Sequence, residues 1–85
     1  MQNRILLELN KYLPSGRHIK YTLYVCGEDK YSVCAEFVGE DSDDRELAED
    51  ICRDRKSAED FIYLLSRNEV EPCHLMDIVY DMLPI

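Results

Sequence analysis

The chain has 85 residues, a hydrophobic fraction of 46% and a net charge of −8. That length allows one hydrophobic core and leaves little room for a deep small-molecule pocket, while the hydrophobic fraction excludes a disordered chain. The negative charge repels phosphate backbones and argues against direct nucleic-acid binding. We expect a single domain over residues 1–85.

The N-terminal stretch MQNRILLELNKYL does not have the form of a signal peptide, because charged side chains interrupt its apolar part. No run in the sequence approaches the ~18 apolar residues that a membrane span needs. We therefore expect a cytoplasmic protein without a membrane partner. In that reducing compartment the four cysteines are expected to stay free thiols: Cys26, Cys34, Cys52 and Cys73.

Residues 3–13 fit two patterns. Helical spacing relates one set of their apolar residues, and strand alternation relates another set, which comprises Ile5, Leu7, Leu9 and Leu13. The turn that follows favours the strand, because Pro14 suits position i+1 of a type I turn and Gly16 supplies the positive φ that closes a hairpin. We predict a β-hairpin and keep a helix over residues 3–13 as the alternative.

Two further stretches alternate as strands. They are HIKYTLYVC at residues 18–26 and, after a turn at Gly27–Lys30, YSVCAEFVG at residues 31–39. Their inner face is expected to carry large apolar side chains: Ile19, Tyr21, Leu23, Val25, Tyr31, Val33, Ala35 and Phe37. The opposite face carries Tyr24, Cys26, Cys34 and Glu36, and is apolar enough to be partly covered by another surface.

The stretch Glu40–Asp50 contains seven acids and one arginine, for a net charge of −6. We expect an acidic loop that ends in a short edge strand around Ala48–Cys52. One interpretation is a docking patch for a basic partner, formed by Glu40, Asp41, Asp43, Asp44 and Glu46. The alternative is a solvated loop that blocks edge pairing. A calcium loop is excluded, because Arg45 and Glu46 stand where it needs an oxygen ligand and a glycine.

Two helices complete the chain. Asp54 or Ser57 can cap a helix that runs through about Asn68, with an inward stripe of Ala58, Phe61, Ile62 and Leu65. The last helix has Pro72 at its first position and a buried stripe of Leu75, Ile78, Val79 and Met82. This order predicts an α+β fold, in which a small antiparallel sheet of three to four strands is followed by two C-terminal helices packed on one face.

Cys73 and His74 form the candidate pair for chemistry, because the start of a helix lowers the pKa of a thiol. Neighbours in a helix point about 100° apart, however, so these two side chains cannot readily hydrogen-bond to each other. The cysteines and the two histidines also lack the C-x-x-C and H-x-x-x-H spacings that zinc sites show. We therefore expect no catalytic residue, no metal and no cofactor.

From LPSGRHIKYTLYV to EDICRDRKSAEDFIYLLSRNEVEPCHLMDIVYDML, the chain resembles a family of small uncharacterised bacterial proteins that carry a domain of unknown function. The specific part is the signature P-x-H-L-x-D-[IV]-[VI]-x-D-[FM]-L. It is met here by Pro72, His74, Leu75, Asp77, Ile78, Val79, Asp81, Met82 and Leu83. Glu71 and Tyr80 depart from the pattern, since the family tends to place a capping Ser or Thr and an acid there. The resemblance implies strands followed by two helices, a bacterial cytoplasmic protein and no activity that can be named.

Together these features favour a non-catalytic interaction or regulatory module whose partner is a protein or a second copy of itself. Self-association is expected through the sheet face that bears Tyr24, Cys26 and Cys34. Asp77 and Asp81, four residues apart on a flank of the last helix, would form an acidic contact edge. An acidic inhibitor of a DNA-binding protein or nuclease, with residues 40–50 mimicking nucleic acid, is the alternative. An enzyme that uses Cys73 and His74 is the third hypothesis.

Overall fold

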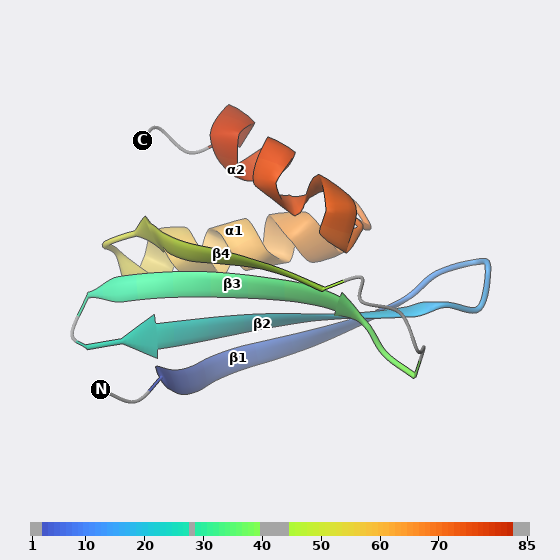
Figure 1. Ribbon diagram of the computed structural model, residues 1–85, viewed down its shortest axis with the longest axis horizontal. Coiled ribbons are helices and arrows are strands. Elements are labelled where there is room, and N and C mark those ends of the chain that lie inside the picture. Colours follow the sequence, from blue (N-terminus) through green and yellow to red (C-terminus); the bar gives the residue numbers. More distant parts are fainter. Residues whose placement is uncertain (1–2, 28, 40–44, 83–85) are drawn as a thin grey trace.

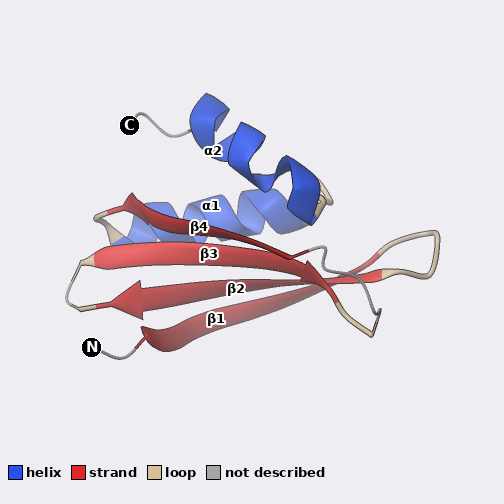
Figure 2. Ribbon diagram, in the orientation of Figure 1, coloured by secondary structure: helices blue, strands red, loops and turns tan. Residues whose placement is uncertain are grey.

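The computed structural model describes residues 3–27, 29–39 and 45–82. Within them, strands β1 (Asn3–Tyr12), β2 (His18–Cys26), β3 (Lys30–Phe37) and β4 (Arg45–Cys52) form one antiparallel sheet in the order β1-β2-β3-β4. Helix α1 (Arg55–Arg67), the 3-10 turn η1 (Pro72–His74) and helix α2 (Leu75–Met82) follow (Figure 1). The α+β class and the order of strands before helices are confirmed, with both helices packed on one face of the sheet (Figure 2).

Residues 3–12 are a strand and not a helix. β1 pairs with β2 from Asn3 opposite Cys26 to Tyr12 opposite His18. In the turn, the Gly16 N–H donates to the Leu13 carbonyl at 2.9 Å, and Gly16 has a φ of 91°. The turn at Pro14–Gly16 brings residues 3–12 alongside β2, where the two strands pair along their length, and this tertiary pairing decides for the strand pattern over the helical one.

The core lies between the sheet and the helices, where the sequence pattern placed it. All eight inner-face residues predicted for β2 and β3 are buried, as are the four residues of the α1 stripe. On α2, Leu75 and Val79 are buried and Ile78 is half-buried, while the side chain of Met82 lies outside the described residues. α1 packs against all four strands, and α2 packs mainly along β4.

β4 begins earlier than expected. The predicted edge strand covered only Ala48–Cys52, but Arg45, Glu46 and Leu47 pair with Glu36, Ala35 and Cys34 of β3. Acidic residues are uncommon in strands, which made the stretch resemble a loop. The register then shifts between Ala48 and Cys52, and Asp50 adopts a positive φ of 53° within this bulge.

Asp54, and not Ser57, caps α1. Its carboxylate accepts hydrogen bonds from the backbone N–H and the hydroxyl of Ser57, both at 2.9 Å, and these bonds lower the pKa of Asp54. Asn68 follows the last residue of the helix, as predicted.

The last helix begins three residues later than predicted. Pro72 opens a 3-10 turn in which the Leu75 N–H donates to the Pro72 carbonyl, and α2 starts at Leu75. The His74 N–H donates to the Glu71 carbonyl at 2.9 Å, which closes the same short turn. Cys73 and His74 therefore lie in this turn and not in the first turn of an α-helix.

Candidate functional site: the open face of the sheet

The sheet has one face packed against the helices and one open face. Within the described residues, no helix packs on the face that carries Tyr24 and Cys34 (Figure 2). Because side chains alternate along a strand, the register places one row of residues from all four strands side by side on this face: Asn10, Lys20, Glu36 and Arg45. The next row consists of Glu8, Thr22, Cys34 and Leu47.

Ion pairs cross the open face from one edge strand to the other. The Nζ of Lys20 lies 3.7 Å from a carboxylate oxygen of Glu8 and 3.4 Å from one of Glu36. The Nε of Arg45 lies 3.3 Å from the second oxygen of Glu36. The hydrogen bond and charge of Glu36 raise the pKa of Lys20. Exposed pairs of this kind stabilise a monomer little. They link side chains of alternating charge on four neighbouring strands.

The predicted interface residues surround a small hollow on this face. Tyr24 and Cys26 are half-buried and line a depression of about 180 Å³, together with Ser32, Arg45, Leu47 and Glu49. Cys34 is different, because only 2% of its surface is exposed. Burial raises the pKa of the Cys34 thiol against the opposing charge of Arg45. The structure therefore places Tyr24 and Cys26 at the surface and Cys34 beneath it.

The open face also carries apolar side chains that the sequence pattern missed. Ile5 is 53% exposed and Leu47 is 38% exposed. Ile5 was placed on the same face as Leu7 and Leu9, and this was wrong. The register of β1 shifts between Ile5 and Leu7, so Ile5 lies opposite Tyr24 while Leu7 lies opposite Leu23 of the core. A bulge of this kind leaves no clear mark in a run of apolar residues.

Near the turn that joins β1 and β2, the open face is largely aromatic. The rings of Tyr12 and His18 stack with their centroids 4.3 Å apart, and the Nε2 of His18 lies 2.7 Å from the Oδ1 of Asn10. Tyr12 and Val38 are exposed here. This end of the face adds aromatic contact area beside the ion pairs.

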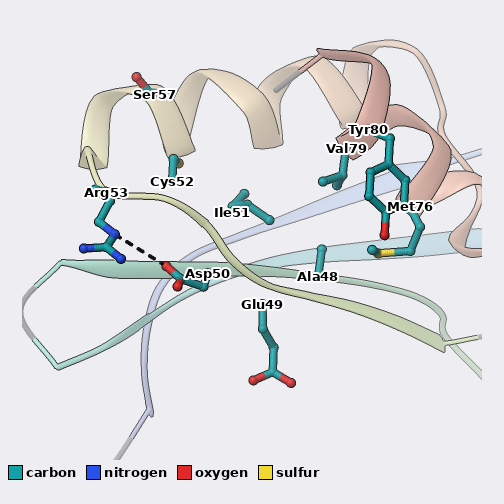
Figure 3. Close-up of a pocket in the computed structure, with 10 residues that line it drawn as sticks. All are labelled: Ala48, Glu49, Asp50, Ile51, Cys52, Arg53, Ser57, Met76, Val79 and Tyr80. Atoms are coloured by element: carbon teal, nitrogen blue, oxygen red, sulfur yellow. Dashed lines mark ion pairs between the residues drawn. The ribbon is translucent and has the colours of Figure 1, made fainter. Parts of the chain in front are cut away.

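A second depression, of about 750 Å³, lies between β4 and α2 (Figure 3). Its lining includes apolar side chains: Ala48, Ile51, Met76 and Val79. At one end Arg53 pairs with Asp50, with Nε and a carboxylate oxygen 3.9 Å apart. Cys52 and Ser57 also line it: the Cys52 thiol donates to the Asp54 carbonyl at 3.7 Å, and the Ser57 hydroxyl donates to the Asp54 carboxylate that caps α1. In the part of the chain that the structure describes, no group of three or more His, Cys, Asp or Glu residues is placed to hold a metal ion.

Cys73 and His74 are both exposed at η1. Among the described residues, no acid or base forms an ion pair or a hydrogen bond with either side chain. Cys73 lies in the 3-10 turn before α2, and not in the first turn of an α-helix, which is the position that the enzyme hypothesis assigned to it.

We expect Cys73 in the folded protein to react with a thiol reagent such as iodoacetamide at the rate of a free cysteine at pH 7, because it is exposed and has no basic partner. Cys34 should react only when the protein unfolds, because it is buried. Peptide mass mapping after timed labelling measures both rates. Cys73→Ser provides the control and should remove the fast reaction. A Cys73 rate far above that of a free thiol would revive the enzyme hypothesis.

The acidic docking patch lies largely outside the described residues, which exclude Glu40, Asp41, Asp43 and Asp44. Glu46 lies on β4 opposite Ala35 and is half-buried, so it does not belong to a solvated loop. The acidic-inhibitor hypothesis therefore stays a prediction.

Among the signature residues, Pro72 and Leu75 are buried, whereas His74, Asp77 and Asp81 are exposed. The signature thus combines residues that pack the C-terminal segment with residues that reach the surface.

Over the described residues, no helix combines the length and apolar character needed to cross a membrane.

Residues 12–84 match a family of unknown function, DUF6514. The chain belongs to this family. The match extends from the end of β1 through the signature, so it includes the Lys20, Glu36 and Arg45 part of the open face. The chain matches no curated protein and no solved structure.

Proposed function

We propose that this member of DUF6514 is a non-catalytic interaction module of the bacterial cytoplasm that self-associates through the open face of its sheet. The observation that carries the proposal is the charge of that face. Its strands present three acids and three bases, namely Glu8, Glu36, Glu49, Lys20, Lys30 and Arg45. Glu49 points from β4 away from the helices (Figure 3). The face is therefore neutral on a chain whose net charge is −8.

A neutral face favours a second copy over a strongly charged partner. Two chains of charge −8 repel each other through their acidic surfaces, and this repulsion is weakest where the charges of each copy cancel locally. Ile5, Tyr24 and Leu47 add apolar and aromatic surface beside the charges. Burying such side chains supplies the attraction that pairs of opposite charges alone do not provide.

The size of the face places the proposed dimer among small, transient interfaces. Four strands about 4.8 Å apart, with about eight residues rising 3.3 Å each, cover roughly 19 Å by 26 Å, or about 500 Å² in projection. Two such faces bury about 1,000 Å², near the lower limit for a specific interface. We therefore expect a dissociation constant on the order of micromolar, and not nanomolar.

Tyr24→Asp is expected to raise the dissociation constant of the dimer at least about tenfold, because it removes an aromatic contact and adds an unpaired negative charge to each copy. Sedimentation equilibrium over a concentration series measures the change. Tyr63→Asp is the matched control: Tyr63 is exposed on α1, which packs on the opposite face of the sheet, and the same substitution there should leave the dimer intact. A dimer of unchanged strength in Tyr24→Asp would refute this interface.

A further inference from the structure

The order of the charges on the open face determines how a second copy would lie on it. Resting on the proposed self-association, we propose that two copies stack face to face about a two-fold axis that runs parallel to the strands, between β2 and β3. This arrangement places β1 on β4 of the second copy and β2 on β3 of the second copy. The strands of the two sheets then run in nearly the same direction, as in aligned sheet packing.

Read from β1 to β4, the ion-paired side chains alternate in sign: Glu8 negative, Lys20 positive, Glu36 negative, Arg45 positive. Reversing this order inverts every sign. A two-fold axis parallel to the strands reverses the order, so it sets Lys20 against Glu36 of the second copy. It likewise brings Glu8 toward Arg45 of the second copy. Four pairs of opposite charge result, because each kind of pair occurs twice in a two-fold dimer.

A two-fold axis that runs across the strands does not have this property. It places each strand on the same strand of the second copy. Centred on the row of charges, it sets Lys20 against Lys20 and Glu36 against Glu36, and like charges in contact oppose association. Displaced from the row, it can bring Glu36 near Lys30 or Arg45 near Glu49 of the second copy, but β2 contains no acid, so Lys20 stays without an opposite partner. The alternation of sign therefore selects the axis parallel to the strands.

The shape of the face agrees with the same axis. Tyr24 and Ser32 lie opposite each other on β2 and β3, and Ser32 lines the 180 Å³ hollow. Reversal places Tyr24 over Ser32 of the second copy, so that a large side chain meets the hollow above a small one. It also brings Ile5 of β1 toward β4 of the second copy, where Leu47 is exposed. Aligned sheets cross at about 30°, so the central pair of Lys20 and Glu36 meets more closely than the outer pair.

Two single substitutions test this arrangement when they are measured apart and together. Lys20→Glu sets two carboxylates against each other at each central contact of the dimer, and Glu36→Lys sets two ammonium groups there. Each variant alone should therefore dimerise at least about tenfold more weakly than the natural chain. In an equimolar mixture, the heterodimer sets the two central acids of one variant against the two central bases of the other, so both central contacts again join groups of opposite charge. The mixture should form a heterodimer within about threefold of the natural affinity, since the remaining contacts are unchanged.

The mixture separates contacts between copies from contacts within one chain. Lys20 and Glu36 also pair within a chain, and mixing does not restore that pair in either variant. The matched controls are Lys56→Glu and Asp60→Lys, which reverse an exposed ion pair on α1 with the same changes in net charge. The dimerisation of these controls should remain that of the natural chain. Native mass spectrometry distinguishes the heterodimer by its mass, and circular dichroism confirms that each variant is folded.

Each outcome has a definite reading. Weak single variants with a restored mixture support the parallel axis. Single variants that dimerise as strongly as the natural chain overturn the parallel axis. Single variants that dimerise weakly, and whose mixture also dimerises weakly, overturn it as well. A natural chain that does not dimerise removes the proposed function itself. A dimer that Tyr24→Asp disrupts, but that neither charge reversal affects, keeps the open face as the interface and rejects only this orientation.

Discussion

Leu65→Ala is expected to lower the free energy of unfolding by about 2–5 kcal/mol, because it deletes a fully buried side chain and leaves a cavity. Leu65 lies on α1, which packs against all four strands, so the surrounding side chains have little freedom to fill the space. A chain of this length has a total stability of about 4–13 kcal/mol, so this variant loses a large share of it. Urea unfolding followed by circular dichroism measures the difference.

Tyr63→Ala on the same helix is the control for that loss. Tyr63 is exposed, and its replacement should change the free energy of unfolding by no more than about 0.5 kcal/mol. Equal losses in the two variants would mean that α1 does not pack on the sheet through Leu65.

Tyr21→Phe is expected to lower the free energy of unfolding by about 1–3 kcal/mol at neutral pH. Tyr21 is fully buried in β2, and its hydroxyl donates a 2.7 Å hydrogen bond to the carbonyl of Val70, in the segment between α1 and η1. Phenylalanine keeps the packing of the ring but leaves that carbonyl without its donor. Unfolding in urea at pH 7 gives the size of the loss, and Tyr63→Phe should show none.

The same hydroxyl makes stability depend on pH in alkali. Burial, followed by the charges of Glu69 and Glu71, raises the pKa of Tyr21 well above its ordinary value of 10.0. In the unfolded chain the hydroxyl ionises near pH 10, whereas in the folded chain it remains neutral at higher pH. Its contribution is therefore complete below pH 10 and falls as the pH rises beyond 10 toward the folded pKa. The Tyr21→Phe variant has no such hydroxyl, so this part of the loss of stability in alkali does not occur in it.

Melting curves from pH 8 to about pH 11 test this difference. The gap in stability between the natural chain and Tyr21→Phe should narrow as the pH rises above 10. Cys34 and Cys52, whose pKa values burial also raises, weaken both proteins alike, so they cancel in the comparison. A gap that stays constant over this range would contradict a neutral, buried Tyr21.

Much of the fold could be predicted because its signals are local. The alternation in β2 and β3 identified their buried face, the Pro14 and Gly16 turn indicated a hairpin, and the apolar stripe of α1 matched its buried side. Asp54 was one of two candidate caps, and its bonds to Ser57 decided between them. Each of these features depends on residues within a few positions of one another.

The open face could be predicted only in part, because it depends on register between strands. Tyr24 and Cys26 were identified from the alternation of one strand, but Ile5 was misplaced by a bulge. Leu47 and Arg45 belong to β4, but the many acids around them made this stretch resemble a loop in the sequence. The alternating charges involve one residue from each of four strands, and no spacing within the sequence shows that they lie side by side.

The most direct test of self-association through the open face is sedimentation equilibrium of the natural chain and Tyr24→Asp, each from about 1 to 200 μM, a range chosen to include the expected micromolar constant. The natural chain should change from a mass of 10.0 kDa to twice that value as the concentration rises. Tyr24→Asp should remain at the lower mass over most of the range. A natural chain that keeps the mass of one copy at every concentration, or a variant that dimerises equally well, would contradict the proposed interface.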